Sequence, residues 1–109
     1  MGQVNVHDIS PFAPSLRSLG PATVLLTVYM QKKDNLNRVQ ASKYDVAKAL
    51  DVSPRTVANW IYKLVKAGLI KYKYSGSARL NPNFAFDGLE SDFEKAKIEW
   101  ETFKSDVPA

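Results

Sequence analysis

Side chains that can read DNA are concentrated in one short segment of the chain, residues 53–70. Arg, Asn and Thr side chains hydrogen-bond base edges, and Lys side chains neutralise phosphates. One side of the segment carries only such groups and a tyrosine, with no acid among them: Arg55, Thr56, Asn59, Tyr62, Lys63 and Lys66. This chemistry predicts a surface for the DNA major groove. We expect Arg55, Thr56 and Asn59 to contact bases or their neighbours, and Tyr62 and Lys63 to lie nearer the phosphates.

The same segment has the pattern of an amphipathic helix that would display these side chains. Ser53 can cap the first free backbone N–H groups, Pro54 suits the first helical turn, and Gly68 suits the end. Apolar residues recur at offsets of four, seven and eight, namely Val57, Ile61, Leu64 and Val65. The spacing therefore predicts a recognition helix with one apolar and one basic face.

The basic residues of the chain are concentrated around this segment. Residues 37–86 carry nine basic and two acidic residues, a net charge of +7, whereas residues 87–109 carry −4 and the whole chain +4. A basic block that coincides with a recognition helix is the electrostatic footprint of a nucleic-acid-binding protein. An ordinary solvated surface that happens to be basic is the alternative interpretation.

The segments before the recognition helix complete a helix-turn-helix pattern. Residues 21–33 are expected to form a buried first helix, and residues 38–41 a short strand. Ser42 can cap a second helix over residues 43–50, and a short turn then leads into the recognition helix. The packing face of the second helix is expected to consist of Tyr44, Val46, Ala47 and Leu50.

Two alternating segments after the recognition helix predict a β-hairpin. They are residues 71–74 and 78–81, joined by a turn that contains a glycine. Alternation puts two lysines on one face of the first segment and two tyrosines on the other, without deciding which face is outward. We expect Arg79, and Lys43 at the start of the second helix, to contact the DNA backbone.

The block from residue 43 to residue 70 resembles the helix-turn-helix of winged-helix DNA-binding proteins. The shared positions are Ala47, Ser53, Thr56-Val57, Ile61, Leu64 and Gly68-Leu69-Ile70. The chain departs from that pattern at Ala58-Asn59, where many relatives carry Ser-Arg, so one phosphate-binding arginine is missing. The resemblance implies an α+β winged helix-turn-helix, with a three-helix core and a β-hairpin wing, to which this chain adds a C-terminal helix.

The stretch after the wing resembles the tail of plasmid and phage replication-initiator proteins of the winged-helix type. An Asn-Pro pair is followed by alternating aromatic residues, a glycine and a helix that contains Glu-Trp; here these are Asn81-Pro82, Phe84, Phe86, Gly88 and Glu99-Trp100. This resemblance implies a protein carried by a replicon.

Residues 87–105 are expected to contain an acidic amphipathic helix. Ser91 and Glu94 have the spacing of a capping box. An apolar seam with heptad spacing follows, formed by Phe93, Ala96, Trp100 and Phe103. Such a seam packs either on its own domain, against the first helix, or on a second copy. We expect dimerisation, which would place two recognition helices about one DNA turn apart on an inverted repeat.

The expected organisation is a single domain with appendages at both ends. It comprises an N-terminal arm (1–20), the winged helix-turn-helix (21–86), the C-terminal helix (87–105) and a tail (106–109). Prolines break up the arm. Its apolar residues could dock on the domain or on a partner subunit: Val4, Val6, Ile9 and Phe12.

Composition argues against enzymatic activity, a metal or cofactor, and a membrane span. The chain has no cysteine, and its single histidine, His7, can build neither a metal site nor a Ser/His/acid set. No glycine-rich phosphate loop is present, and the acids are not clustered as a metal-dependent nuclease needs. No apolar run reaches about 18 residues. We therefore expect no cofactor and a cytoplasmic location.

The sequence thus predicts a homodimeric protein that binds double-stranded DNA. A transcriptional regulator, a replication initiator and a partition factor all need the same surface, so the residues do not separate these roles. A winged-helix protein-interaction module is the alternative, but its recognition face would be neutral or acidic. RNA binding would need an exposed aromatic platform, which only Trp60 or Tyr62 could provide.

Overall fold

Three helices form the core of the fold: α2 (Thr23–Lys32), α3 (Lys43–Leu50) and α4 (Pro54–Lys66). The computed structural model describes residues 2–7 and 18–108. A short 3-10 helix (Gly20–Ala22) leads into α2. These are the three helices that the sequence predicted, and the first starts two residues later than expected because the 3-10 helix occupies its beginning.

Serine caps fix the starts of α3 and α4. The Ser42 hydroxyl accepts a hydrogen bond from the Asp45 N–H at 3.1 Å, and the Ser53 hydroxyl accepts one from the Thr56 N–H at 3.1 Å. Each bond satisfies one backbone donor that has no partner within the helix. Both predicted caps are confirmed.

The end of α4 is set by Gly68, which has a positive φ of 78°. The Leu69 N–H donates to the Leu64 carbonyl at 3.1 Å, and the Gly68 N–H donates to the Val65 carbonyl at 3.0 Å. This pair of bonds is the Schellman arrangement, which a glycine adopts without a Cβ penalty. The chain therefore leaves α4 abruptly and enters the wing.

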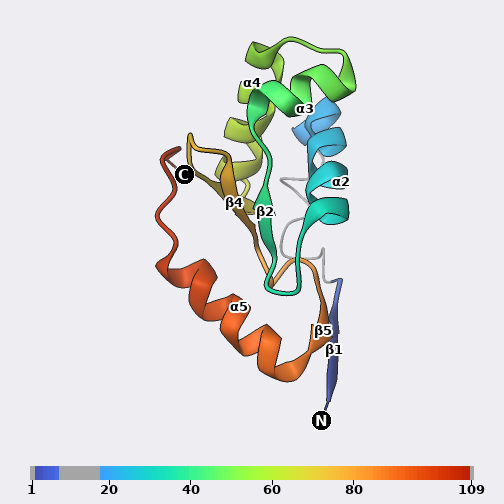
Figure 1. Ribbon diagram of the computed structural model, residues 1–109, viewed down its shortest axis with the longest axis vertical. Coiled ribbons are helices and arrows are strands. Elements are labelled where there is room, and N and C mark those ends of the chain that lie inside the picture. The colour runs from blue at the N-terminus through green and yellow to red at the C-terminus, as the bar shows by residue number, and fades with distance from the viewer. Residues whose placement is uncertain (1, 8–17, 109) are drawn as a thin grey trace.

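The wing is the antiparallel hairpin of β3 (Ile70–Tyr72) and β4 (Ser77–Leu80). A third strand, β2 (Arg38–Gln40), pairs antiparallel with β4, so the strand order is β2-β4-β3. Figure 1 shows β2 and β4 between α2 on one side and α5 on the other. The predicted hairpin and the predicted short strand before α3 are both confirmed.

One hydrophobic core joins the helices to the inner face of this sheet. Its fully buried members include Leu25, Tyr29, Val39, Val57, Leu64, Leu69, Ile70, Ala78 and Leu80. Tyr44 was expected in the core, and this prediction is wrong: its side chain is 64% exposed. The position lies in the first turn of α3, where Val46 and Ala47 face the core instead. In α2, Val24 is exposed, whereas Leu25, Leu26 and Tyr29 are buried.

A second, two-stranded sheet was not predicted. It pairs β1 (Gln3–Val6) antiparallel with β5 (Phe86–Leu89). Residues 3–6 of the expected arm are therefore paired with the chain's own strand β5, one of the two docking possibilities open for Val4 and Val6. The predicted docking of Ile9 and Phe12 lies outside the described residues.

Helix α5 (Glu90–Thr102) follows β5 directly. The predicted cap at Ser91 is wrong, because the helix starts before it: Leu89 occupies the N-cap position, and no side chain caps the helix. The Glu90 N–H instead donates to the Gly2 carbonyl at 3.0 Å, next to β1. A tertiary contact thus replaces the expected local cap.

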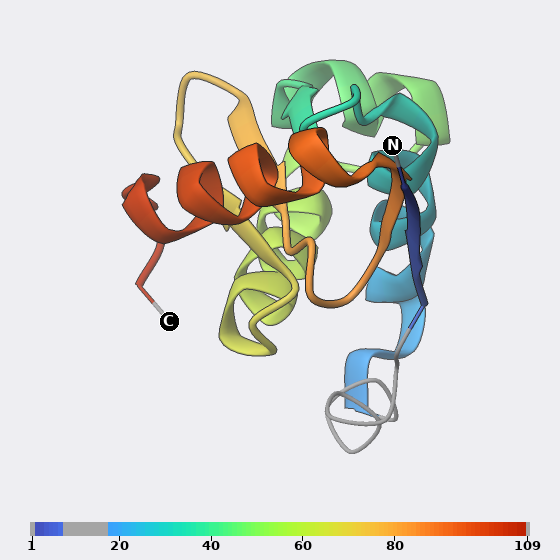
Figure 2. The same cartoon turned by 90° about the horizontal axis from the view of Figure 1, so that it is seen from below.

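The aromatic seam of α5 packs on the chain's own strands. The ring centroids of Phe93 and Phe86 are 5.0 Å apart, and Ala96 is buried. Figure 2 shows α5 starting beside β1 and β5 and running across the molecule toward the wing. There the Lys71 ammonium lies 4.6 Å from the Trp100 ring centroid. Ala96 is thus buried, while Phe93, Trp100 and Phe103 contact strands and basic side chains of the same chain and stay partly exposed.

No helix in the described ranges combines the length and the apolar character needed to cross a membrane.

Candidate nucleic-acid interface

The outer face of α4 is the surface that the sequence predicted for DNA. Four of the predicted contact residues are exposed on it, namely Arg55, Asn59, Tyr62 and Lys63, and Thr56 is half-buried. The opposite face of the helix is buried in the core through Val57, Ile61, Leu64 and Val65. The structure therefore holds the polar residues together on one solvent-facing stripe, while the apolar residues fix the helix in place.

The cations of this stripe are available for a ligand. Across residues 2–7 and 18–108, the side chains of Arg55, Asn59 and Lys63 make no hydrogen bond or ion pair. Thr56 is different, because its hydroxyl lies 2.8 Å from the Ser53 hydroxyl and belongs to the helix cap. Lys66 lies 5.4 Å from the Tyr62 ring centroid, at the far end of the helix. Unpaired cations on a rigid helix can bind phosphates or base edges without first breaking a contact within the protein.

A groove of about 230 Å³ adjoins this face of α4. It lies between the start of α3, the side of α4, the wing turn and the C-terminal tail, and it is lined by Lys43, Ala58, Ile61, Tyr62, Tyr72, Tyr74, Val107 and Pro108. The groove brings Lys43 and Tyr62, which are distant in sequence, into one site. Lys43 is half-buried, and its ammonium lies 5.3 Å from the Tyr44 ring centroid.

The wing turn is attached to the start of α3 next to this groove. The Ala41 N–H donates to the Gly76 carbonyl at 3.0 Å, and the Gln40 side-chain amide donates to the Ser75 carbonyl at 3.3 Å. Gly76 has a φ of +96°, and a Cβ there would lie 3.1 Å from the Ser42 nitrogen. Glycine is therefore needed both for the turn and for the close approach. The adjacent Tyr74 is 72% exposed.

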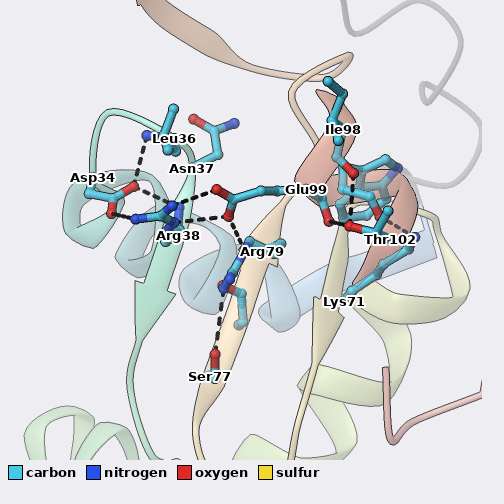
Figure 3. Close-up of polar contacts among 12 residues, drawn as sticks. Asp34, Leu36, Asn37, Arg38, Lys71, Ser77, Arg79, Ile98, Glu99 and Thr102 are labelled. Carbon is cyan, nitrogen blue, oxygen red and sulfur yellow. Dashed lines mark hydrogen bonds and ion pairs between the residues drawn. The ribbon is translucent and has the colours of Figure 1, made fainter. Parts of the chain in front are cut away.

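Arg79, which was predicted to contact DNA from the wing, lies elsewhere. Its Nε donates to Glu99 Oε1 at 3.2 Å and its Nη1 donates to the Ala78 carbonyl at 3.0 Å, as Figure 3 shows for Glu99. The guanidinium also lies 4.6 Å from the Phe103 ring centroid, and the side chain is only 19% exposed. Arg79 thus faces α5 on the outer side of the sheet, and we leave it out of the proposed DNA contacts.

Glu99 joins two strands of the sheet from its position on α5. Besides Arg79 on β4, it binds Arg38 on β2, whose Nε donates to Oε1 at 2.9 Å and whose Nη2 donates to Oε2 at 2.5 Å. Figure 3 shows both arginines converging on this carboxylate. The hydrogen bond from Arg38 lowers the pKa of Glu99 and outweighs the opposite effect of burial.

This lowered pKa predicts a pH dependence of stability. A carboxylate whose folded-state pKa lies below its ordinary value of 4.5 stabilises the fold above that value, and this contribution is lost as the pH falls through the folded pKa. In Glu99→Gln, we expect a lower free energy of unfolding at neutral pH and a smaller further loss on acidification. Urea unfolding across this pH range measures both. Glu101→Gln, at an exposed position of the same helix, should behave like wild type; equal pH profiles for Glu99→Gln and wild type would contradict the prediction.

Two exposed tyrosines beside the interface were not among the predicted contacts. Tyr44 was assigned to the core, and the alternation in residues 71–74 left the direction of Tyr74 open. The strand ends at Tyr72, and the turn then carries Tyr74 outward. Gly76 was the signal in the sequence that could have placed Tyr74 in the turn rather than in the strand.

The comparisons with known proteins agree with this geometry. The family described as "Iron dependent repressor, N-terminal DNA binding domain" matches residues 22–78, which cover α2, α3, α4 and the wing up to the start of β4. No curated protein and no solved structure matches the chain. The match does not extend to the resemblance to replication initiators, which stays a prediction.

The iron in the family's description has no matching donor set in the part of this chain that the structure describes. Within residues 2–7 and 18–108, no three side chains of His, Cys, Asp or Glu come together as a metal site would require. Oxygen, nitrogen and sulfur donors must converge to hold such an ion. The described residues therefore do not fit a metal site. The match spans more than half of the chain, and the chain belongs to the iron-dependent-repressor family of N-terminal DNA-binding domains, which bind DNA in transcription regulation.

Proposed function

We propose that this chain is a sequence-specific binder of double-stranded DNA that regulates transcription by inserting α4 into the major groove. The observation that carries the proposal is the exposed stripe of Arg55, Asn59 and Lys63, which have no partner within the described residues. A core-anchored helix with such a face satisfies the geometric requirement of major-groove readout.

Position along α4 suggests a division of roles. Arg55 lies in the first turn and Asn59 one turn later, and the N-terminal part of a recognition helix is the part that usually reaches base edges. Thr56 is a weaker candidate for a base contact, because its hydroxyl already serves the cap. Tyr62 and Lys63 lie further along the helix and suit phosphate contacts. Lys43 would meet the same backbone from the start of α3.

The proposed binding unit is a homodimer on an inverted repeat. Two copies related by a two-fold axis place their recognition helices about one DNA turn apart. The α5 seam is not the proposed contact, because Phe93, Ala96, Trp100 and Phe103 pack on the chain's own strands and basic side chains. Ile98, which is 64% exposed on the other side of α5, is the better candidate for an apolar contact.

Selection of bound fragments from the source DNA at near-physiological salt tests the proposal. We expect discrete inverted-repeat sites at promoters, each bound by two copies of the chain. Sites at an origin would favour replication initiation, and sites at a partition locus would favour partition. Recovery of no fragment above background would overturn specific DNA binding and favour the protein-interaction module.

A further inference from the structure

The C-terminal tail, taken here as residues 105–108 after α5, runs along the open edge of the wing. In the order β2-β4-β3, strand β3 pairs with β4 on one side only. On its other side, the Tyr72 N–H donates to the Ser105 hydroxyl at 3.1 Å, and the Tyr72 carbonyl accepts from the Asp106 N–H at 2.8 Å. The backbone groups that an edge strand would leave open at Tyr72 are therefore satisfied by the tail.

The contacts of the tail extend from the strand into the wing turn. The Ser105 hydroxyl also donates to the Tyr72 carbonyl at 3.0 Å, and the Tyr74 N–H donates to Asp106 Oδ2 at 2.9 Å. Val107 is buried at the edge of the core and lines the groove beside α4. The tail thus connects the core, the strand edge and the wing turn over three consecutive residues.

Besides the tail, the wing turn is held by bonds within the hairpin and by contacts with the α3 side. Within the hairpin, the Lys73 N–H donates to the Ser77 carbonyl at the start of β4, and the Gly76 N–H donates to the Lys73 carbonyl, both at 2.8 Å. Outside the hairpin, the turn is attached to the α3 side through the Gly76 and Ser75 carbonyls, which accept from the Ala41 N–H and the Gln40 amide, and to the tail through the Tyr74 N–H. The Lys73 ammonium also lies 4.9 Å from the Phe103 ring centroid. Tyr74 lines the same groove as Tyr62 of α4.

We propose that Ser105 and Asp106 are positioning residues that hold the wing turn in place beside the recognition helix. The inference rests on the proposed function for its effect on DNA, but the contact itself is a property of the free protein. The turn carries the exposed Tyr74 side chain at the groove that Lys43 and Tyr62 also line, beside the face of α4 proposed for DNA. A turn already held there loses less conformational freedom when DNA binds, and so binding is tighter. Release of the tail would free the Tyr72 and Tyr74 amides and let the turn move away from α4.

Ser105→Ala tests this role without changing the charge of the protein. It removes the hydroxyl that binds both backbone groups of Tyr72, whereas Ser105→Thr keeps a hydroxyl and should rescue. Thr102→Ala is the matched control, because the Thr102 hydroxyl, three residues earlier, donates to carbonyls of its own helix and to no other group among the described residues. Asp106→Ala is a second variant, in which the Tyr74 amide loses its acceptor.

Two measurements on the full chain are needed. Amide hydrogen exchange without DNA should be faster at Tyr72 and Tyr74 in Ser105→Ala, with the amides of α4 unchanged, and should be like wild type in Ser105→Thr and Thr102→Ala. Affinity for the selected DNA site should fall about fivefold in Ser105→Ala, as expected for the loss of one hydrogen-bonded anchor.

The exchange rates test whether the tail holds the wing, and the affinities test whether this contact matters for DNA binding. If amide exchange at Tyr72 and Tyr74 were unchanged in both Ser105→Ala and Asp106→Ala, the proposal that the tail holds the wing turn in place would be rejected. Faster exchange with unchanged DNA affinity would overturn its role in positioning the wing for DNA. If wild type bound no DNA, the proposed function would fail, while the exchange data would still decide whether the tail fixes the wing.

Discussion

Replacing Arg55 by alanine is expected to weaken binding to the selected DNA site by about 1–3 kcal/mol, roughly 5- to 150-fold. Arg55 is exposed in the first turn of α4 and makes no ion pair in the described part of the chain. Its guanidinium can therefore form two hydrogen bonds to one guanine edge, and alanine removes both. Because those bonds distinguish bases, Arg55→Ala should also relax the preference for the site over unrelated DNA.

Lys95→Ala is the matched control for this result. Lys95 is exposed on α5, and its loss changes the net charge by the same amount. Titration of both variants with specific and unrelated DNA, at two salt concentrations, separates base readout from overall charge. Equal effects of the two substitutions on specific binding would show that Arg55 contributes only charge, and the assignment would then be rejected.

The largest expected effect on stability comes from Leu64→Ala on the opposite face of the same helix. Leu64 is completely buried, and its carbonyl also accepts the hydrogen bond that ends α4. Truncation of a buried leucine removes apolar contacts and leaves a cavity, which costs about 2–5 kcal/mol. That is a large share of the roughly 5–15 kcal/mol that stabilises a typical domain. Urea unfolding measures the change.

Lys63→Ala, one residue earlier, provides the comparison within the helix. Its side chain points to solvent, so the free energy of unfolding should change by no more than about 0.5 kcal/mol. Leu64→Ala should therefore lower the free energy of unfolding, whereas Lys63→Ala should lower the affinity for DNA. Similar unfolding curves for the two variants would contradict the described orientation of α4.

The sequence by itself determined the helix-turn-helix and the wing. The signals for these elements are local: Ser53 caps α4, Gly68 ends it, and the spacing of Val57, Ile61 and Leu64 defines its buried face. A helix face and its caps depend on residues within a few turns of one another, so a single sequence contains the information. The exposed stripe that includes Arg55 followed directly from that periodicity.

Only the tertiary structure decided what the remaining segments contact. The apolar seam of α5 indicates that the helix packs on another surface, but not on which one. In the structure, Phe93 packs on Phe86 of β5, and Trp100 lies beside Lys71 of β3. Arg79 has the charge of a DNA contact, yet Glu99, twenty residues away, binds it. The pairing of β1 with β5 and of the tail with Tyr72 joins segments separated by most of the chain or by a whole helix. Such contacts depend on how the elements pack in space, which no spacing along the chain specifies.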